Sequence, residues 1–197
     1  MPVPFFQVLN RLPEMPPLQH HDVVLRIPAL TDYQDWAALR EESRAFLKQW
    51  EPTWPSDDLT KPAFRRRIRR YHQDMRCDRA YSFFLFRQSD DRLIGGLSLS
   101  NVRRGITQAC TLGYWMGKPY AGSGYMTAGV TAALPFVFQT LRLHRLEAAC
   151  LPYNAASIRL LEKVGFDREG YAKRYLKIDG EWRDHLLFGL ISSDESR

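Results

Sequence analysis

The segment from Leu112 to Thr127, LGYWMGKPYAGSGYMT, constrains the fold more than any other part of the chain. It begins with a strand, turns through Gly122 and Gly124, and continues as an apolar helix. Such a connection leaves main-chain N–H groups unpaired at the positive end of a helix dipole, which is a ready anion site. No Lys-Ser/Thr pair follows the last glycine and the three-glycine spacing is absent, so neither a P-loop nor a dinucleotide fingerprint is present.

The rest of the chain fits one domain around this segment. With 197 residues and 45% apolar residues, we expect a loose arm over residues 1–20 and a single domain over residues 21–197. The order of elements indicates an α+β domain with a mixed sheet. The expected strands cover 22–27, 81–87, 93–101, 109–116, 146–150, 166–175 and 184–191; the expected helices cover 31–50, 60–75, 125–141 and 155–164, with Pro135 disturbing the third.

Charge and cysteine content limit the possible partners and the compartment. The net charge of +6 favours an anionic partner, although a basic surface can also serve solubility alone. The three cysteines lack metal-site spacing, so we expect neither a metal site nor a disulfide framework, and a reducing, cytoplasmic location. No apolar run reaches the roughly 18–20 residues that cross a membrane, and the first residues do not read as a secretory signal.

A second informative segment is Leu151–Phe166, LPYNAASIRLLEKVGF. Asn154 stands directly before a predicted helix and Ser157 lies on its first turn. Asn154 is a good helix cap, which is explanation enough for its presence. Its side-chain amide could alternatively reach an amide-containing ligand arm, with the Ser157 hydroxyl facing the same space.

Taken together, these segments resemble the Gcn5-related N-acetyltransferase (GNAT) superfamily over nearly the whole chain, from Asp22 to Ile191. Several stretches further resemble the branch that acetylates ribosomal proteins at an N-terminal alanine. They are FLKQWEP (46–52), LSNVRRG (99–105), ACTLGYWMG (109–117), AGSGYM (121–126) and EGYAKRYLKIDGEWRDH (169–185).

The resemblance implies a fold and a cofactor. The GNAT fold splits a mixed, mostly antiparallel sheet between its fourth and fifth strands, here 109–116 and 146–150, and acetyl-CoA binds in the split. Ala121 and Met126 depart from the usual phosphate-loop residues, but main-chain N–H groups need no particular side chain. The implied cofactor-binding residues are Leu112, Tyr114, Met116, Ala121, Gly122, Ser123, Gly124, Tyr125, Met126, Thr127, Asn154 and Ser157.

The implied activity is transfer of an acetyl group from acetyl-CoA to the N-terminal amine of an alanine-starting, small-subunit ribosomal protein. Direct attack through a tetrahedral intermediate needs no cysteine nucleophile. An N-terminal amine has a pKa near ~7.7–8.0, so modest assistance is enough, whereas a lysine near ~10.4 needs more. Two alternatives stay open: acetylation of a small amine such as an amino acid or antibiotic, and a non-catalytic module that binds the ribosome or RNA.

Four residues are candidates for the proton transfers. Ser157 matches the position of an acid toward the leaving thiolate in related branches. Glu51 and His144 are candidate bases, although a solvated loop carboxylate and a structural histidine explain them equally. Tyr175 could line the acceptor channel or merely pack. No carboxylate occurs in KRYLKI (173–178), where related branches carry a glutamate.

The helix FRRRIRRYH (64–72) concentrates positive charge. A solvated face is the ordinary explanation for such a run. Docking on ribosomal RNA or another acidic surface is the alternative. The arginines concerned are Arg65, Arg66, Arg67, Arg69 and Arg70.

Overall fold

The computed structural model describes residues 15–192, and one eight-stranded sheet forms its centre. The strand order is β1-β2-β3-β4-β5-β6-β8-β7, and only β5 and β6 are parallel neighbours within the described part of the chain. This confirms the expected α+β class with a mixed, mostly antiparallel sheet. The strands are β1 (Leu18–His20), β2 (Val23–Arg26), β3 (Tyr81–Arg87), β4 (Arg92–Arg103), β5 (Ala109–Met116), β6 (Arg145–Cys150), β7 (Asp167–Ile178) and β8 (Glu181–Ile191).

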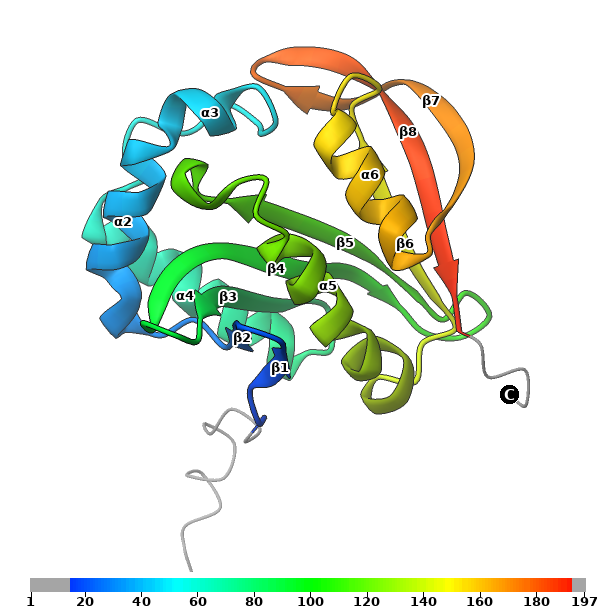
Figure 1. The fold of residues 1–197 in the computed structure, drawn as a ribbon, viewed down its shortest axis with the longest axis horizontal. Coiled ribbons are helices and arrows are strands. Elements are labelled where there is room, and N and C mark those ends of the chain that lie inside the picture. The colour runs from blue at the N-terminus through cyan, green and yellow to red at the C-terminus, as the bar shows by residue number, and fades with distance from the viewer. Residues whose placement is uncertain (1–14, 193–197) are drawn as a thin grey trace, which may run out of the picture.

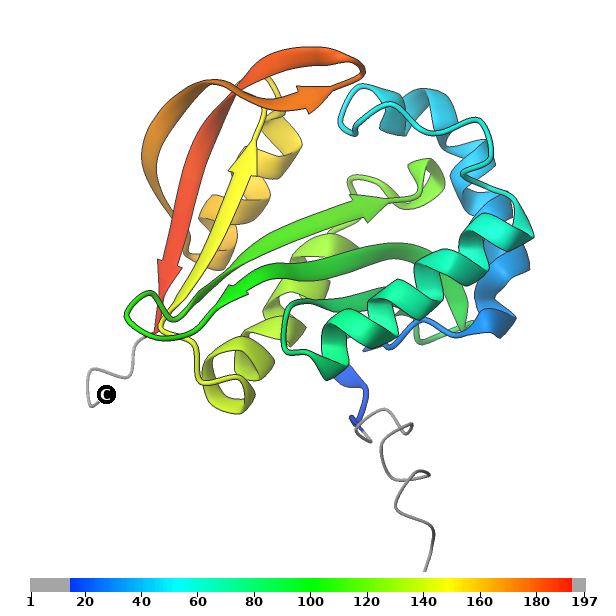
Figure 2. The same cartoon turned by 180° about the vertical axis from the view of Figure 1, so that it is seen from behind.

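Helices cover both faces of this sheet (Figures 1 and 2). The helices α5 and α6 lie on one face, and α4 crosses β3 on the other. None of the helices described is long and apolar enough to cross a membrane. The helices are α2 (Tyr33–Glu42), α3 (Arg44–Lys48), α4 (Lys61–Arg76), α5 (Tyr125–Pro135) and α6 (Ala155–Val164), with short turns η1 (Leu30–Asp32), η2 (Lys118–Tyr120) and η3 (Phe136–Thr140).

The sequence of β3, YSFFLFR, explains the two-sided burial of the sheet. Phe83 and Leu85 belong to the core under α5 and α6, whereas Phe84 and Phe86 belong to the core under α2 and α4. Successive side chains of a strand point to opposite faces, so an uninterrupted apolar run indicates a strand that is covered on both sides.

The N-terminal part of the chain differs from expectation in two places. Leu18–His20 pair with Val23–Leu25, so the end of the predicted arm is an edge strand of the sheet; residues 1–14 lie outside the described residues. The single helix expected over 31–50 is divided at Ser43. This buried side chain accepts the Lys118 N–H at 2.9 Å, a contact across the fold that a local pattern does not reveal.

Pro135 has the expected effect on its helix. α5 ends at Pro135, and the chain continues as a π-helical turn over Phe136–Thr140. Proline has no N–H to donate and its ring crowds the preceding turn, so regular α-helical hydrogen bonding cannot continue.

The strands β5 and β6 separate part of the way along their length. Their paired positions run from Ala109–Arg145 to Leu112–Ala148. Beyond that point β5 continues to Met116 beside β4, and β6 continues to Cys150 beside β8. The result is a fork that opens toward the carboxyl ends of both strands. Because β1 adds a strand at the start, β5 and β6 are the fourth and fifth strands expected from the sequence.

Candidate active site

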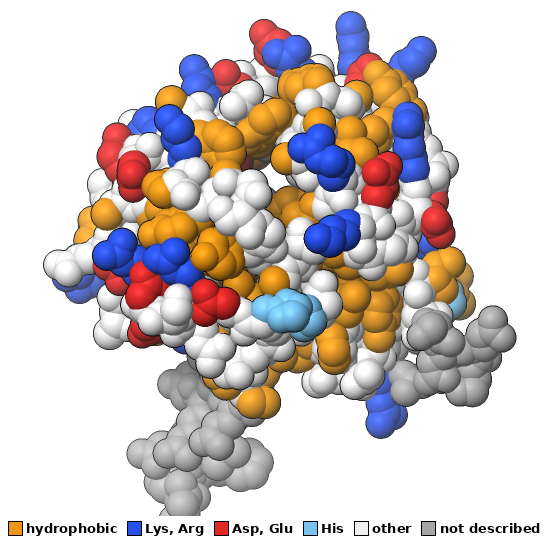
Figure 3. All heavy atoms as spheres, viewed as in Figure 1, with side chains coloured by type: hydrophobic (Ala, Val, Ile, Leu, Met, Phe, Trp, Pro, Cys, Tyr) orange, Lys and Arg blue, Asp and Glu red, His pale blue; other side chains and the backbone are white. Residues whose placement is uncertain are grey.

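A cavity of about 480 Å³ lies at the fork. It takes its walls from the end of β5, the loop before α5, the first turns of α6 and the segment after α3. In the space-filling view the surface is hollowed between the two halves of the molecule, with hydrophobic side chains inside and Lys or Arg side chains at the rim (Figure 3). The lining residues are Phe46, Leu47, Trp50, Glu51, Tyr114, Trp115, Met116, Tyr120, Ala121, Gly122, Gly124, Tyr125, Met126, Thr127, Asn154, Ala156, Ser157, Arg159, Leu160 and Lys163.

The loop before α5 has the conformation that its glycines predict. Gly122 and Gly124 have φ angles of +79° and +82°, in the left-handed region that a residue with a Cβ adopts at a cost. A Cβ added at either position would meet nothing within 4 Å. Open space therefore borders the main chain on this side, and a ligand can approach the loop closely.

Hydrogen-bond donors point out of this loop. The first turn of a helix has N–H groups without intrahelical partners, and in α5 these belong to Tyr125, Met126 and Thr127. The N–H of Ala128 is bonded to the Gly124 oxygen at 3.1 Å. The N–H of Ala121 is also occupied, by the Lys118 oxygen at 3.2 Å, so Ala121 cannot contribute its main-chain donor as expected. The donors that follow Ala121 form an anion site at the positive end of the α5 dipole.

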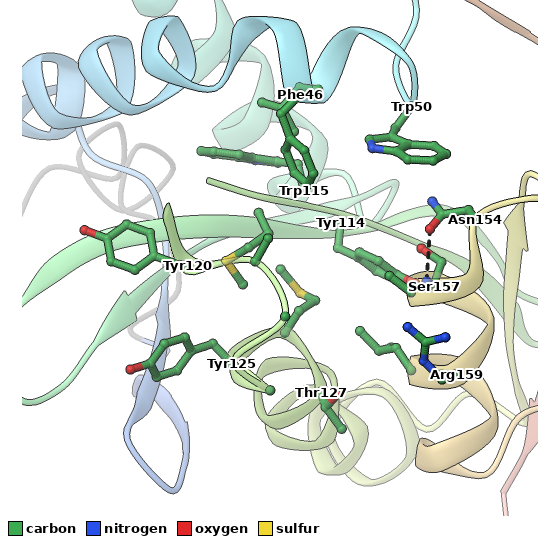
Figure 4. A pocket seen from close by; sticks show the side chains of 18 of the residues that line it. Phe46, Trp50, Tyr114, Trp115, Tyr120, Tyr125, Thr127, Asn154, Ser157 and Arg159 are labelled. Atoms are coloured by element: carbon green, nitrogen blue, oxygen red, sulfur yellow. Dashed lines mark hydrogen bonds between the residues drawn. The ribbon is translucent and has the colours of Figure 1, made fainter. Parts of the chain in front are cut away.

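On the other side of the cavity, Asn154 caps α6. Its Oδ1 accepts the N–H of Ser157 at 3.1 Å (Figure 4), which is the ordinary role of an asparagine before a helix. Asn154 and Ser157 both line the cavity as well. The cap therefore fixes the first turn of α6, and with it the Ser157 side chain, beside the fork.

Tyr114 extends from the separated part of β5 toward Ser157 (Figure 4). Burial raises the pKa of Tyr114 to about 12, and hydrogen bonding with Ser157 acts in the opposite direction. The phenol is therefore protonated throughout the physiological range. Tyr114 on β5 and Ser157 on α6 thus lie on the two sides of the fork, and the Tyr114 ring points toward Ser157 (Figure 4).

The only carboxylate that lines the cavity, within the described residues, belongs to Glu51. Arg40 Nη1 and Nη2 donate to Glu51 Oε1 and Oε2 at 2.9 and 2.7 Å, and Trp54 Nε1 donates to Oε2 at 2.7 Å. The Arg40 guanidinium is buried and lies 4.1 Å from the centre of the Trp54 ring. The carboxylate thus serves an ion pair inside the wall of the cavity.

The same wall touches the β7–β8 hairpin. The N–H of Asp179, at the hairpin tip, donates to the main-chain oxygen of Glu51 at 3.0 Å. The Lys48 ammonium lies 3.6 Å from the Asp179 carboxylate, and the rings of Trp50 and Tyr153 are 6.0 Å apart. The segment after α3 and the β6–β8 half of the molecule are therefore in contact at the open end of the fork.

Most of the predicted site residues meet at this cavity, but four do not. Leu112 is buried at the last β5–β6 pair, and Ser123 is exposed on the loop; neither lines the cavity.

His144 precedes β6 at the end of the strand opposite the fork, where its main-chain oxygen accepts the Ser192 N–H. Tyr175 lies on β7 with its ring centre 5.8 Å from that of His185. Neither His144 nor Tyr175 is among the residues that line the cavity.

Several lining residues were not predicted. Arg159 and Lys163 are four residues apart on α6 and so share a face of the helix, a spacing that the sequence displays. Leu160 lies on the same side. The aromatic residues Phe46, Trp50, Trp115 and Tyr120 come from α3, the segment after it, β5 and η2, and no local pattern joins such distant positions.

Comparison with known proteins agrees with this geometry. Residues 22–167 match the acetyltransferase (GNAT) domain family. The chain is 39% identical to the [ribosomal protein uS5]-alanine N-acetyltransferase of Escherichia coli (strain K12) over 153 residues, which are 78% of this chain and 79% of that protein.

Two solved structures have the same fold. The ribosomal-protein-S5-alanine acetyltransferase of Vibrio fischeri superimposes with a TM-score of 0.86 at 28% identity, covering 93% of this chain and 100% of that one. Mycobacterium smegmatis RimJ, in complex with CoA-disulfide, superimposes with a TM-score of 0.84 at 30% identity, covering 92% and 88%. The expected sheet, its fork and its anion-binding loop agree with this match, and the chain belongs to the GNAT family of acetyltransferases.

Proposed function

We propose that this enzyme transfers an acetyl group from acetyl-CoA to the N-terminal α-amino group of an alanine-starting protein of the small ribosomal subunit. The observation that carries the proposal is the strand–loop–helix connection at the fork, where free N–H groups border a cavity. The similarity to uS5-alanine acetyltransferases supports the choice of acceptor.

The chemistry of the cavity lining suits acetyl-CoA. The N–H groups of residues 122–127 would hold the diphosphate, and the open space beside Gly122 and Gly124 leaves room for it. Arg159 and Lys163 add positive charge on the facing side. When bound, the donor supplies an acetyl thioester, and the placement of Asn154 and Ser157 at the fork suits its amide-containing arm.

The proposed acceptor suits a site without a strong base. An N-terminal amine with a pKa near ~7.7–8.0 is about one-tenth unprotonated at pH 7, whereas a lysine is almost entirely charged. The enzyme therefore only has to select the neutral amine and place it at the fork. Glu51 is committed to Arg40 and Trp54, so we assign it to the wall of the acceptor side.

The decisive experiment compares acceptors. Purified enzyme and acetyl-CoA are incubated with a peptide that begins with alanine and contains an internal lysine, and fragment masses locate the added acetyl group. We expect modification of the α-amine only. A preference for small amines over the peptide would overturn the assignment of a protein N-terminus as the acceptor. Unchanged masses of the ribosomal proteins in cells lacking the gene would overturn the assignment of a ribosomal protein as the substrate.

The arginine-rich helix α4 offers a contact with ribosomal RNA. Arg66 and Arg67 pair with Asp57 and Asp58, so part of this charge is used within the protein. Arg65, Arg69 and Arg70 are exposed and have no carboxylate partner among the described residues. We propose that these three meet RNA phosphates in the cytoplasm. Replacing all three with glutamine should weaken binding to ribosomal subunits and flatten its salt dependence, without altering acetylation of a free peptide.

A further inference from the structure

A second cavity lies on the face of the sheet that α2 and α4 cover. Its volume is about 250 Å³, and it is bounded by the η1 turn and the first turns of α4. Figure 2 shows α4 crossing this face of the sheet, with α5 behind it. None of its lining residues belongs to the cavity at the fork, so the two sites are separate. The lining residues are Leu30, Thr31, Tyr33, Lys61, Phe64 and Arg65.

The floor of this second cavity is apolar and aromatic. Phe64 is fully buried, and its ring centre lies 5.6 Å from that of Tyr33. Leu30 borders the same space and is 55% exposed, so its side chain offers apolar surface to a ligand. Thr31 adds one hydroxyl, which can donate or accept a hydrogen bond. The volume is below the roughly 300–1,000 Å³ of cavities that enclose a whole small molecule, and it suits one ring of a larger ligand.

Positive charge lines one side of this cavity. Lys61 and Arg65 belong to its lining, and Arg69 follows them at the same spacing of four residues on α4. The three therefore share one face of the helix, at intervals of about 6 Å along its axis. All three are exposed, and none has a carboxylate partner among the described residues. The Lys61 ammonium lies 6.0 Å from the centre of the Tyr33 ring, which places charge directly beside the apolar floor.

The carboxylates nearest to this row of cations in the sequence are paired with other residues. Asp57 and Asp58, before the start of α4, pair with Arg66 and Arg67. The Asp32 carboxylate, in η1, accepts two hydrogen bonds from the arginine that ends β2, at 3.0 and 2.7 Å. The row is thus available to an anion from outside the protein.

Hydrogen bonds fix the two walls of this cavity relative to each other. His72 Nε2, on α4, donates to the main-chain oxygen of Pro28 at 3.1 Å. The Tyr33 hydroxyl donates to the main-chain oxygen of Leu59 at 3.2 Å. The segment that carries η1 is therefore attached both to α4 and to the loop before it, and the cavity is already formed without a ligand.

We propose that this cavity receives the base of an unpaired RNA nucleotide, while Lys61, Arg65 and Arg69 hold the neighbouring phosphates. The inference rests on the proposed contact between α4 and ribosomal RNA. An unstacked base needs apolar or aromatic surface and its phosphates need cations, and both are present here side by side. Bases in a duplex are stacked inside and cannot enter, so the site selects a single-stranded loop or bulge. A run of acidic side chains would meet the cations but would not use the apolar floor.

The first test compares single-stranded and double-stranded RNA. A fluorescently labelled strand of about 12 nucleotides, within the range of single-strand site sizes, is titrated with the protein. We expect it to bind about tenfold more tightly than the same sequence as a duplex. Leu30→Asn should remove that advantage and leave the salt dependence of binding unchanged. Ile106→Asn is the matched control, because Ile106 is an exposed apolar residue outside the cavity, and it should have no effect.

The second test concerns the cations. Lys61→Gln and Arg65→Gln should each weaken binding of the single strand and reduce the slope of log Kd against log salt by about 0.7, the value for one phosphate contact of a single strand. Arg66→Gln is the control on the same helix, because Arg66 already pairs with Asp57. It should change the slope much less.

Photochemical crosslinking locates the base directly. The labelled strand is prepared with 4-thiouridine, irradiated in the presence of the protein, and digested. We expect peptide masses to place the crosslink within residues 30–33 or 61–65. Crosslinks confined to other segments would contradict the proposed cavity.

The outcomes separate the base site from the functions on which it rests. Equal affinity for single strand and duplex, with losses in the glutamine variants but none in Leu30→Asn, would retain the contact between α4 and RNA and contradict the base site. A wild-type protein that binds no RNA would contradict both. Polyglutamate that binds as tightly as the RNA strand and displaces it would assign the site to an acidic protein segment instead. Acetylation of the alanine peptide should proceed at the wild-type rate in all of these variants, since the fork is separate.

Discussion

Arg40 holds the Glu51 carboxylate with both of its terminal nitrogens, and the two side chains are 7% and 19% exposed. Removing one member of such a pair leaves the other without compensation. We expect Arg40→Met to lower the free energy of unfolding by about 3 kcal/mol. Urea denaturation provides the measurement. Arg44→Met, which breaks the exposed pair with Glu41, is the control and should have a much smaller effect, because water screens that pair; equal losses in the two variants would contradict the assignment.

Glu51→Gln tests whether this carboxylate is a base. Glutamine has nearly the same shape but cannot take up the proton. We expect kcat/KM to rise with pH in wild type and variant alike, with one midpoint near the ~7.7–8.0 of the acceptor amine. The pH profile on an alanine peptide decides the matter. A loss of 10²-fold or more in kcat for the variant would restore Glu51 as the base.

Gly124→Val tests the anion-binding loop. Valine at φ +82° is strained, and its side chain enters the space assigned to the diphosphate. We expect the KM for acetyl-CoA to rise about tenfold or more, equivalent to about 1.4 kcal/mol. Gly105→Val is a matched control, since Gly105 also has a positive φ of +66° and open space, but lies in the β4–β5 turn. Both should lose about 1–2 kcal/mol of stability, and only the first should alter KM.

The buried ring of His185 predicts a dependence of stability on pH. Burial lowers the pKa of His185, against smaller opposing effects of the Arg183 oxygen and Asp184. The unfolded chain therefore binds a proton more readily than the folded protein as the pH falls below about 6.5. The Tm of the wild type should decrease between pH 7.5 and pH 5.5, and His185→Gln should show a smaller decrease. Parallel curves would exclude this residue as a cause.

The three free cysteines should differ in reactivity toward iodoacetamide. Cys77 is exposed, whereas burial raises the pKa of Cys110 to about 12 and that of Cys150 to about 11. Only the thiolate reacts, so Cys77 should be alkylated first and the other two only on unfolding. Peptide masses after timed labelling measure the order. Early modification of Cys110 would indicate that β5 opens more readily than its pairing suggests.

Local signals were enough to predict the part of the site that depends on neighbouring residues. Gly122, Gly124 and Asn154 could be placed because a turn, a helix start and a cap each depend on a few consecutive positions. The fork was predicted from the resemblance to the family, because no sequence pattern within 109–116 or 146–150 indicates where the two strands separate.

The remaining features of the site could not be predicted, because they depend on contacts between residues that are far apart in the sequence. Glu51 was recognised as a site residue, but its role changed once Arg40 and Trp54 were seen to surround it. At the break between α2 and α3, the Ser43 side chain accepts the N–H of Lys118, from a distant part of the chain. His144 has the chemistry of a base, yet the length of β6 separates it from the fork. The type of a residue indicates which reactions its side chain can assist, but the fold decides whether that side chain lies close enough to the site to do so.

That path has a consequence of its own at the single parallel pair of strands. To lie parallel to β5, β6 must be reached by a crossover, and here the crossover is α5. Because α5 follows the carboxyl end of β5, its N-terminus lies at the edge of the sheet where β5 and β6 separate. The connection of the strands alone therefore places the helix start, with its N–H donors, beside the fork, whatever side chains line the cavity.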